Sequence, residues 1–258
     1  PKECVLLSHN DELYRSEDIM SLAKELRNKY SFQSTDIVLL EDLNAVELVT
    51  AIIALDGYVS KLIICSSNEL SVSSEYSMKL TAGLVSLRLS SAAYSVLTET
   101  EWVIYTSGTT GTPKGVMTSH RSMIANSTLQ MLQGAAVSQH SSSYGIDWSK
   151  NTPTSLLTSP LFHVSGLSAG AVTSLFAGST TLVYDGRFLA DKVIKLIQKF
   201  SVTSWGGAVP TALKRLLDEA EAKNLNLESV LVVGGGGAPM PPEPVSYTHL
   251  TLPTTPYV

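Results

Sequence analysis

Two kinds of apolar pattern alternate along this chain. Short β-prone runs such as Asp36–Leu40 have the length and composition of buried strands. Between such runs, apolar residues recur at helical spacing, first over 16–30 and then over 44–56. Ser16 is placed to cap the first of these helices, and Gly57 is placed to end the second. The pattern predicts strands that are joined by helical crossovers.

The alternation continues through the rest of the chain. The further predicted elements are strands over 61–65, 102–105, 115–118, 155–158, 180–184, 202–205 and 229–233, and helices over 119–136, 166–176, 189–200 and 211–223. Two Ser-rich stretches, 66–77 and 138–151, are predicted to be loops. Strands separated by helices of roughly 10 to 15 residues predict an α/β fold with layered, largely parallel sheets.

The segment 105–116 carries the strongest chemical signal. It reads Tyr-Thr-Ser-Gly-Thr-Thr-Gly-Thr-Pro-Lys-Gly-Val and lies between two predicted strands, so it forms a hairpin-like loop. Its glycines allow backbone N–H groups to approach an anion closely, its hydroxyls are hydrogen-bond donors, and its lysine is a point charge for phosphate oxygens. The candidate phosphate-binding residues are Thr106, Ser107, Gly108, Thr109, Thr110, Gly111 and Lys114.

Two other phosphate loops do not fit this segment. A Walker A loop requires a lysine that is followed by Ser or Thr and leads into a helix, whereas Pro113 precedes Lys114, Gly115 follows it, and a strand comes next. The dinucleotide fingerprint Gly-x-Gly-x-x-Gly is also missing from this segment. A solvated Ser/Thr/Gly turn without function is the remaining alternative.

The segment resembles the signature of the adenylate-forming superfamily, which includes acyl-CoA synthetases, firefly luciferase and peptide-synthetase adenylation domains. Three further segments follow in the order found in that superfamily: Pro160–Gly166 (Pro-Leu-Phe-His-Val-Ser-Gly), Val209–Leu213 and Gly234–Pro239. The resemblance implies that the loop binds the β- and γ-phosphates of ATP and that the second segment borders the acyl pocket. It also implies that the Gly-Gly-Ala-Pro stretch lies along adenine and the acyl group.

The resemblance implies roles for individual residues. Lys114 and His163 are the candidate catalytic residues, and no metal-ligating residue is expected. The candidate adenine- and acyl-binding residues are Trp205, Gly206, Gly236, Gly237, Ala238 and Pro239, although Trp205 could equally pack in a core. Amino-acid-activating relatives commonly have an Asp after the Phe that corresponds to Phe162, and this chain has His163 there. An imidazole is a poor partner for an ammonium group, so we expect an acid without an α-amine.

The expected reaction is ATP-dependent activation of a carboxylic acid as acyl-AMP, followed by transfer to CoA, with Mg²⁺ as a cofactor. A fatty acid is the first expectation for the acid and an aromatic acid such as o-succinylbenzoate the second. A peptide-synthetase adenylation module and a non-catalytic nucleotide-binding remnant remain alternatives. The partners expected are therefore small molecules: a carboxylic acid, ATP and CoA.

Composition limits the classes of partner and the cellular locations that are compatible with this chemistry. The net charge of −5 gives no electrostatic footprint for nucleic acid. The apolar runs are too short for a membrane span, although peripheral contact with lipid stays open. Two cysteines are too few for a disulfide framework and fit a reducing, cytoplasmic location.

Both ends of the chain have the character of cut ends. We expect residues 1–244 to be a partial N-terminal AMP-binding domain that lacks the small C-terminal domain and the downstream catalytic motifs of the superfamily, and therefore to be inactive alone. Residues 245–258 resemble the translation of a sequencing adapter and are expected to be a non-native tail.

Overall fold

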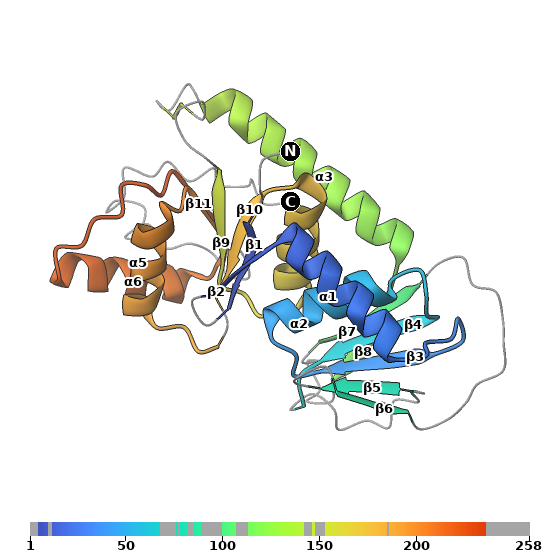
Figure 1. Cartoon of the computed structure of the whole chain (residues 1–258). Helices are drawn as coiled ribbons and strands as arrows, with labels where there is room; N and C mark the ends of the chain where they lie inside the picture. The colour runs from blue at the N-terminus through green and yellow to red at the C-terminus, as the bar shows by residue number, and fades with distance from the viewer. Residues whose placement is uncertain are drawn as a thin grey trace.

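The structure, a computed structural model, describes residues 5–9, 12–67, 76, 78–81, 85–88, 100–106, 113–141, 146–147, 153–184 and 186–235. Two sheets dominate this part of the chain (Figure 1). The first has the order β6-β5-β3-β4-β7-β8 and the second the order β10-β9-β11-β12, while β1 and β2 form a small antiparallel pair. Most neighbouring strands are parallel, which confirms the predicted layered α/β fold.

The strands are β1 (Val5–His9), β2 (Glu12–Arg15), β3 (Ile37–Glu41), β4 (Lys61–Cys65), β5 (Met78–Thr81), β6 (Val85–Arg88), β7 (Glu101–Thr106), β8 (Lys114–Ser119), β9 (Thr154–Leu157), β10 (Thr180–Val183), β11 (Ser204–Ala208) and β12 (Val232–Gly235). The helices are α1 (Ser16–Lys29), α2 (Ala45–Leu55), α3 (His120–Ser141), the π-helical segment η5 (Ser165–Val172), α4 (Thr173–Ala177), α5 (Ala190–Phe200) and α6 (Pro210–Ala222).

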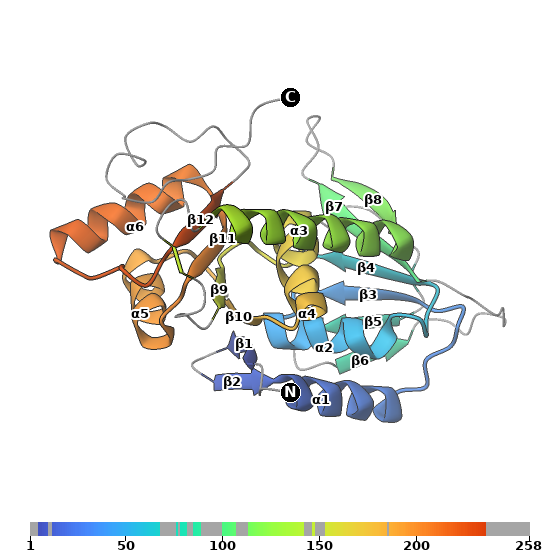
Figure 2. The same cartoon turned by 90° about the horizontal axis from the view of Figure 1, so that it is seen from above.

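Helices α1 and α2 cover one face of the first sheet (Figure 2). Helix α2 begins with a reciprocal cap: Asn44 Oδ1 accepts from the Glu47 N–H at 2.9 Å, and Glu47 Oε2 accepts from the Asn44 N–H at 3.1 Å. Strands β3 and β4 are continuous apolar runs because both faces of their sheet are buried. The carboxyl ends of these strands are thereby held in fixed positions.

The second sheet packs on α5 and α6, and one of its faces joins the core of the first sheet. Leu156 and Trp205 point toward α5 and α6. Leu157 and Val183 instead belong to the core that contains α1 and α2. Because neighbouring residues of a strand point to opposite faces, β9 and β10 supply both cores.

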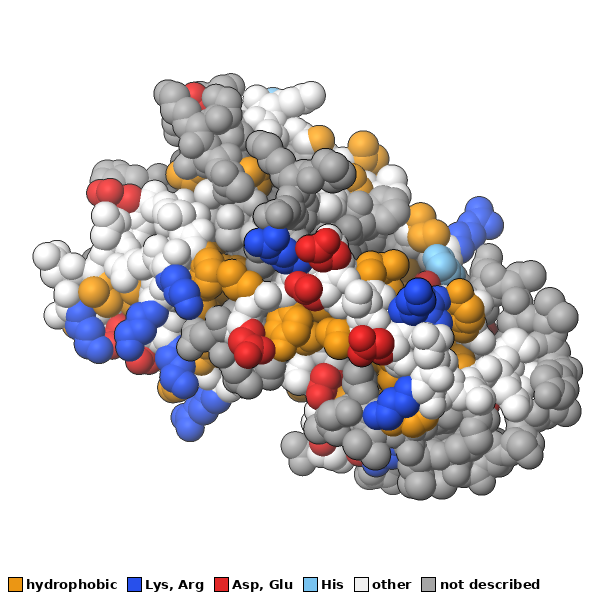
Figure 3. All heavy atoms as spheres, in the orientation of Figure 1, with side chains coloured by type: hydrophobic (Ala, Val, Ile, Leu, Met, Phe, Trp, Pro, Cys, Tyr) orange, Lys and Arg blue, Asp and Glu red, His pale blue; other side chains and the backbone are white. Residues whose placement is uncertain are grey.

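Helix α3 runs along the molecule between the hairpin β7–β8 and η5 (Figures 1 and 2). Asn126 Nδ2 donates to Ser168 Oγ at 2.7 Å, and Ser168 is buried. The helix continues to Ser141, beyond its predicted end at residue 136, so the predicted loop 138–151 begins later than expected. On the face shown in Figure 3, acidic and basic side chains are interspersed among apolar ones.

Several predicted boundaries were wrong. Arg15, and not Ser16, is the N-cap of α1, and its N–H donates to the Asp18 carboxylate at 2.7 Å. The strand predicted over 202–205 is β11, which begins at Ser204 and extends through two glycines. Strands β1, β2, β5 and β6 were not predicted, because each is only four or five residues long. β5 and β6 alternate apolar and polar residues, but over four residues each.

Candidate functional site

The predicted phosphate loop connects the two antiparallel strands β7 and β8. Their ladder runs from the pair Glu101–Ser119 to the pair Thr106–Lys114, which lies next to the loop. Thr106 Oγ1 donates to the Lys114 carbonyl oxygen at 3.3 Å. The hairpin predicted around this motif is therefore present. The loop residues Ser107, Gly108, Thr109, Thr110 and Gly111 lie outside the described residues, and their roles stay predictions.

Lys114 is the first residue of β8, and its side chain is exposed. To the described residues, its ammonium group makes no hydrogen bond or ion pair. An ammonium group at this position can therefore contact an incoming anion without first leaving a partner within that part of the chain.

The loop leaves the first sheet at a topological switch point. The chain after β4 leads to β5 on one side, and the chain after β7 leads to β8 on the other. Ligands of open α/β sheets bind outside the carboxyl ends of the strands at such points. In the second sheet, the connections after β9 and β11 diverge in the same way.

The second predicted segment lies at the carboxyl end of β9. The His163 N–H donates to the Pro160 carbonyl at 3.2 Å, and the His163 carbonyl accepts from the Leu167 N–H at 2.9 Å, so a tight turn leads directly into η5. The rings of Phe162 and His163 pack in a tilted arrangement, with centroids 4.6 Å apart. Both side chains are half-buried.

A cavity of about 430 Å³ lies where the carboxyl ends of the two sheets meet. Its lining comes from the ends of β3 and β4, the start of α2 and the segments after β9 and β10. These residues are Leu40, Asp42, Leu43, Asn44, Leu48, Ile64, Cys65, Thr158, Pro160, Leu161, Phe162, Tyr184 and Gly186. Phe162 thus reaches a cavity, as the position of its segment predicted. Lys114, His163, Trp205 and Gly206 are not among the lining residues.

Two polar side chains of this cavity have shifted pKa values. Burial raises the pKa of Asp42, but hydrogen bonds from Ser67 and Ser66 and the charge of Lys79 outweigh it and hold that pKa below its ordinary value. Burial raises the pKa of Tyr184, whose hydroxyl donates to the Arg187 carbonyl at 2.9 Å. At neutral pH the cavity therefore presents a carboxylate and an un-ionised phenol.

Sequence reasoning missed Asp42, Asn44, Cys65 and Tyr184 as candidate site residues. A signal for them existed, because each follows or ends a buried parallel strand. The rule that ligands gather at the carboxyl ends of parallel strands would have selected them.

Trp205 is buried in the core of the second sheet, with 1% of its surface exposed. Its indole N–H donates to Thr158 Oγ1 at 2.9 Å, and its ring stacks on Phe188 with centroids 6.0 Å apart. A Cβ on Gly206 would come within 3.1 Å of Leu157 Cδ2, so close packing accounts for that glycine. Ligand contacts of Trp205 and Gly206 stay predictions, and Gly236, Gly237, Ala238 and Pro239 lie outside the described residues.

The described residues hold neither a cluster of metal ligands nor a membrane-spanning helix. Among these residues, no three His, Cys, Asp or Glu side chains come together as a metal site. The same residues contain no helix with the length and apolar character needed to cross a membrane.

Comparison with known families gives a match to the AMP-binding enzyme family over residues 15–256. The 2-succinylbenzoate–CoA ligase of Bacillus subtilis is 34% identical over 149 residues, which are 58% of this chain and 27% of the relative. The 4-coumarate–CoA ligase-like 5 protein of Oryza sativa is 34% identical over 142 residues, which are 55% of this chain and 26% of the relative. The aligned region thus spans about a quarter of each of these curated relatives.

Solved structures share the fold. The o-succinylbenzoate coenzyme A synthetase of Bacillus subtilis in complex with AMP matches with a TM-score of 0.66 at 24% identity, over 95% of this chain and 53% of that chain. The N-terminal domain of FACL13 from Mycobacterium tuberculosis matches with a TM-score of 0.67 at 19% identity, over 95% of this chain and 68% of that chain.

Proposed function

Because the chain belongs to the AMP-binding enzyme family, we propose that it is part of an ATP-dependent acid-thiol ligase that forms an acyl-CoA. The observation that carries the proposal is the hairpin β7–β8, which places the exposed Lys114 and Thr106 together at the end of the ladder beside the signature loop. Relatives that are named as CoA ligases support the same class of reaction.

The proposed reaction has two steps. A carboxylate oxygen of the acid attacks the α-phosphorus of ATP, a bond to phosphorus forms, and the bond to the leaving pyrophosphate breaks. The thiolate sulfur of CoA then attacks the acyl carbonyl, and AMP leaves with the electron pair of the broken C–O bond. The first step turns a poor acylating agent into a mixed anhydride with a good leaving group.

The residues of the chain contribute positioning and charge to the first step. Lys114 binds the phosphate oxygens and stabilises the negative charge that develops on pyrophosphate. Thr106 and the loop residues Ser107, Thr109 and Thr110 supply hydroxyl donors. Mg²⁺ neutralises further phosphate charge when it is bound with ATP. Because the described residues hold no acidic cluster for a metal, we propose that the ion enters on the nucleotide.

The cavity at the meeting of the two sheets is the proposed site for the acid. Phe162 lines it, and His163 packs on Phe162 at the start of η5, where an imidazole can donate a hydrogen bond to a carboxylate or phosphate oxygen. The cavity wall is largely apolar, the carboxylate of Asp42 in that wall already accepts from the Ser67 N–H, and no Asp follows Phe162 to bind an α-ammonium group. An acid without an α-amine is therefore part of the proposal.

The relatives favour an aromatic acid over the fatty acid that the sequence placed first. Most of their names specify an aromatic acid, 4-coumarate or 2-succinylbenzoate, and one specifies marinolic acid, which is not aromatic. A volume of about 430 Å³ lies within the range of pockets for small organic ligands.

We propose a cytoplasmic location for the enzyme, in keeping with its low cysteine content.

The test is ATP–pyrophosphate exchange, measured on this chain and on a polypeptide extended to the length of its relatives. Aromatic, fatty and amino acids are supplied in separate reactions. We expect exchange with aromatic or fatty acids from the extended polypeptide and little or none from this chain alone. In the extended polypeptide we expect a loss of about 10- to 100-fold in Lys114→Ala, since a charge-assisted hydrogen bond contributes about 1.5–3 kcal/mol.

The matched control is Lys214→Ala, which removes an exposed lysine of α6 that pairs with Asp218. This variant should exchange pyrophosphate like the unsubstituted protein. Exchange that depends only on an amino acid would assign the protein to the peptide-synthetase branch. Exchange that is unchanged in Lys114→Ala would contradict the role of Lys114.

A further inference from the structure

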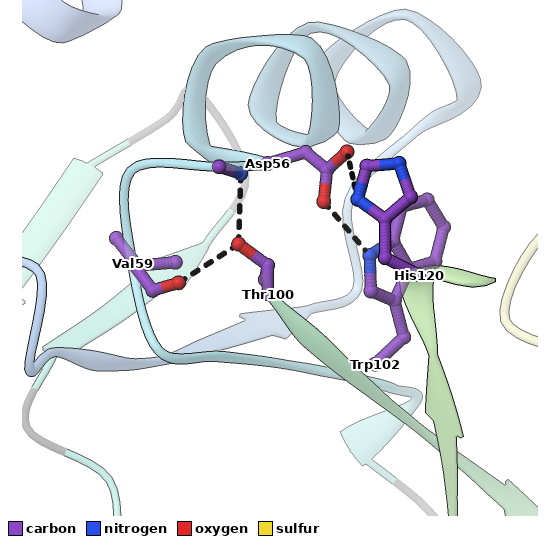
Figure 4. A network of polar contacts seen from close by, with 6 residues as sticks. Asp56, Val59, Thr100, Trp102 and His120 are labelled. Carbon is purple, nitrogen blue, oxygen red and sulfur yellow. Dashed lines mark hydrogen bonds and ion pairs between the residues drawn. The ribbon is translucent and has the colours of Figure 1, made fainter. Parts of the chain in front are cut away.

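The phosphate-loop hairpin is defined here as β7 and β8 (residues 101–119), and its base is the end of the two strands away from the loop. At this base, the carboxylate of Asp56 contacts one residue of β7 and the residue that directly follows β8. Asp56 is the C-cap of α2. Trp102 Nε1 donates to Asp56 Oδ1 at 3.1 Å, and His120 Nδ1 lies 3.5 Å from Asp56 Oδ2 (Figure 4). Trp102 belongs to β7, and His120 directly follows β8 as the first residue of α3. One carboxylate therefore holds both strands of the hairpin against α2.

The surroundings make these contacts stronger than surface contacts. Trp102 is 4% exposed, so little water could replace the Asp56 carboxylate as acceptor for its indole N–H if Asp56 were removed. The side chains of Asp56 and His120 are 25% and 35% exposed, so water reaches their contact only in part. A buried donor without an acceptor is costly, so the local backbone would have to shift to satisfy it.

The hydrogen-bonded ladder between β7 and β8 connects the base of the hairpin to the loop, so a displacement of the strands at the base also displaces the residues beside the loop. Trp102 pairs with Thr118 near the base, and Thr106 pairs with Lys114 next to the loop. Trp102, Ile104 and Thr106 lie on the same face of β7, because side chains alternate along a strand. A rotation or slip at Trp102 would therefore move Thr106 and Lys114 as well.

From these contacts we propose that Asp56 is a positioning residue for the nucleotide. It holds Trp102 and His120, and thereby fixes the orientation of the hairpin that presents Thr106 and Lys114 to the polyphosphate of ATP. Asp56 itself does not touch the nucleotide. This inference rests on the proposed function of the same hairpin.

A neighbouring contact provides a control. Thr100, which is fully buried, accepts from the Gly57 N–H at 2.8 Å and donates to the Val59 carbonyl at 2.8 Å (Figure 4). It thus fixes the turn after α2 without contacting Trp102 or His120 through its side chain. Thr100→Val keeps the shape of this side chain and removes both bonds. It should lower stability without changing how the hairpin is held.

The experiment compares Asp56→Ala, Asp56→Asn and Thr100→Val with the unsubstituted chain. Three quantities are measured: amide hydrogen exchange of β7 and β8, the dissociation constant for Mg-ATP, and the free energy of unfolding in urea. In Asp56→Ala we expect faster exchange in both strands and an affinity for Mg-ATP about 2- to 30-fold weaker, the range spanned by residues that act at a distance.

The conservative variant separates positioning from bulk stability. Asp56→Asn keeps an oxygen that accepts from Trp102, and should recover exchange protection in β7 and part of the affinity. Thr100→Val should unfold at lower urea concentration and yet bind Mg-ATP with an affinity within about 2-fold of the unsubstituted chain. If Asp56 had a merely structural role, this difference in Mg-ATP affinity between Asp56→Ala and Thr100→Val would not be observed.

Three results would overturn the inference. If Asp56→Ala binds Mg-ATP as the unsubstituted chain does, Asp56 does not position the hairpin, and the proposed function still stands. If Thr100→Val loses as much affinity as Asp56→Ala, the effect is one of stability alone. If the unsubstituted chain does not bind Mg-ATP, the comparison is made in the polypeptide extended to the length of the relatives; if that polypeptide does not bind Mg-ATP either, the proposed function fails and the inference fails with it.

Discussion

At the scale of single residues, Asp42 shows how strand ends collect polar groups at the cavity. It follows β3 with a backbone φ of 50°, and its Oδ1 accepts from the Ser67 N–H at 3.0 Å. This bond ties the segment after β3, which lines the cavity, to the segment after β4, a strand whose last residue, Cys65, also lines it. The left-handed backbone conformation is one that Asp adopts more readily than most residues.

The lowered pKa of Asp42 predicts a specific acid sensitivity. A carboxyl group whose pKa is lower in the folded state stabilises the fold above its unfolded pKa of about 3.9. That stability is lost as the pH falls through the lower folded pKa. The expected result for Asp42→Asn is therefore a smaller loss of stability on acidification. Urea unfolding midpoints at pH 7 and pH 3 measure it.

Other carboxylates also titrate over this pH range, so only the difference between variants is informative. Asp218→Asn serves as the control, because Asp218 is an exposed residue of α6 with an exposed lysine as its partner. Its acid sensitivity should match that of the unsubstituted chain. An Asp42→Asn protein that is as acid-sensitive as this control would contradict the role given to Ser67.

A comparison of the predicted and observed positions of single residues shows which features of the site could be predicted from the sequence. The positions of Lys114 beside the loop and of Phe162 at a cavity followed from motif and strand order. The burial of Trp205 did not, because a bulky residue at a strand end suits a pocket wall and a core equally well. The contact of Asp56 with Trp102 joins residues 46 positions apart, and no local pattern reports a contact of that kind.

At the scale of elements, close backbone approach explains the geometry at the start of η5. A Cβ on Gly166 would come within 2.6 Å of the Ser159 carbonyl oxygen and closer still to that of Pro160. Real Cβ atoms do not approach backbone oxygens at such distances. Only glycine at this position therefore allows η5 to begin immediately after the turn that follows β9. The turn and η5 together set the direction of Phe162 and His163.

Two alanine substitutions test this account. Gly166→Ala should destabilise the protein by about 1–3 kcal/mol, because the new methyl group must displace backbone. Gly134→Ala provides the matched control, since no atom lies within 4 Å of a Cβ there and the residue sits inside α3. The control should stabilise the protein by about 0.5–1 kcal/mol. Urea unfolding gives both values, and equal effects of the two substitutions would contradict the steric account.

Elements with a clear periodicity of apolar residues could be predicted from the sequence, whereas elements whose positions depend on tertiary contacts could not. Strands β3 and β4 and helix α2 lie close to the predicted bounds, because buried apolar runs, helical spacing and a terminating glycine are local signals. Strand β11 was displaced by two residues because its glycines carry no strand preference and are held by pairing with β9 and β12. Tertiary pairing likewise accounts for β5 and β6.

At the scale of the whole molecule, the two sheets share a core that supports the cavity. Leu161 lies in the segment after β9, is 5% exposed, and packs with residues of α1, α2 and β4. Leu157 and Val183 bring β9 and β10 into the same core. A shared core of this kind predicts that the two sheets unfold together rather than as separate units.

The three tryptophans allow this prediction to be tested. Trp102 reports on the first sheet and Trp205 on the second, once Trp148 and the other tryptophan have been replaced by phenylalanine. Leu161→Ala should lower stability by about 2–5 kcal/mol. Because the core is shared, we expect the urea midpoints of both reporters to fall by the same amount. Leu129→Ala, at a side chain that is 65% exposed on α3, should leave both midpoints nearly unchanged. A shift of only one reporter in Leu161→Ala would mean that each sheet folds on its own core, and the cavity between them would then depend on a ligand to hold its shape.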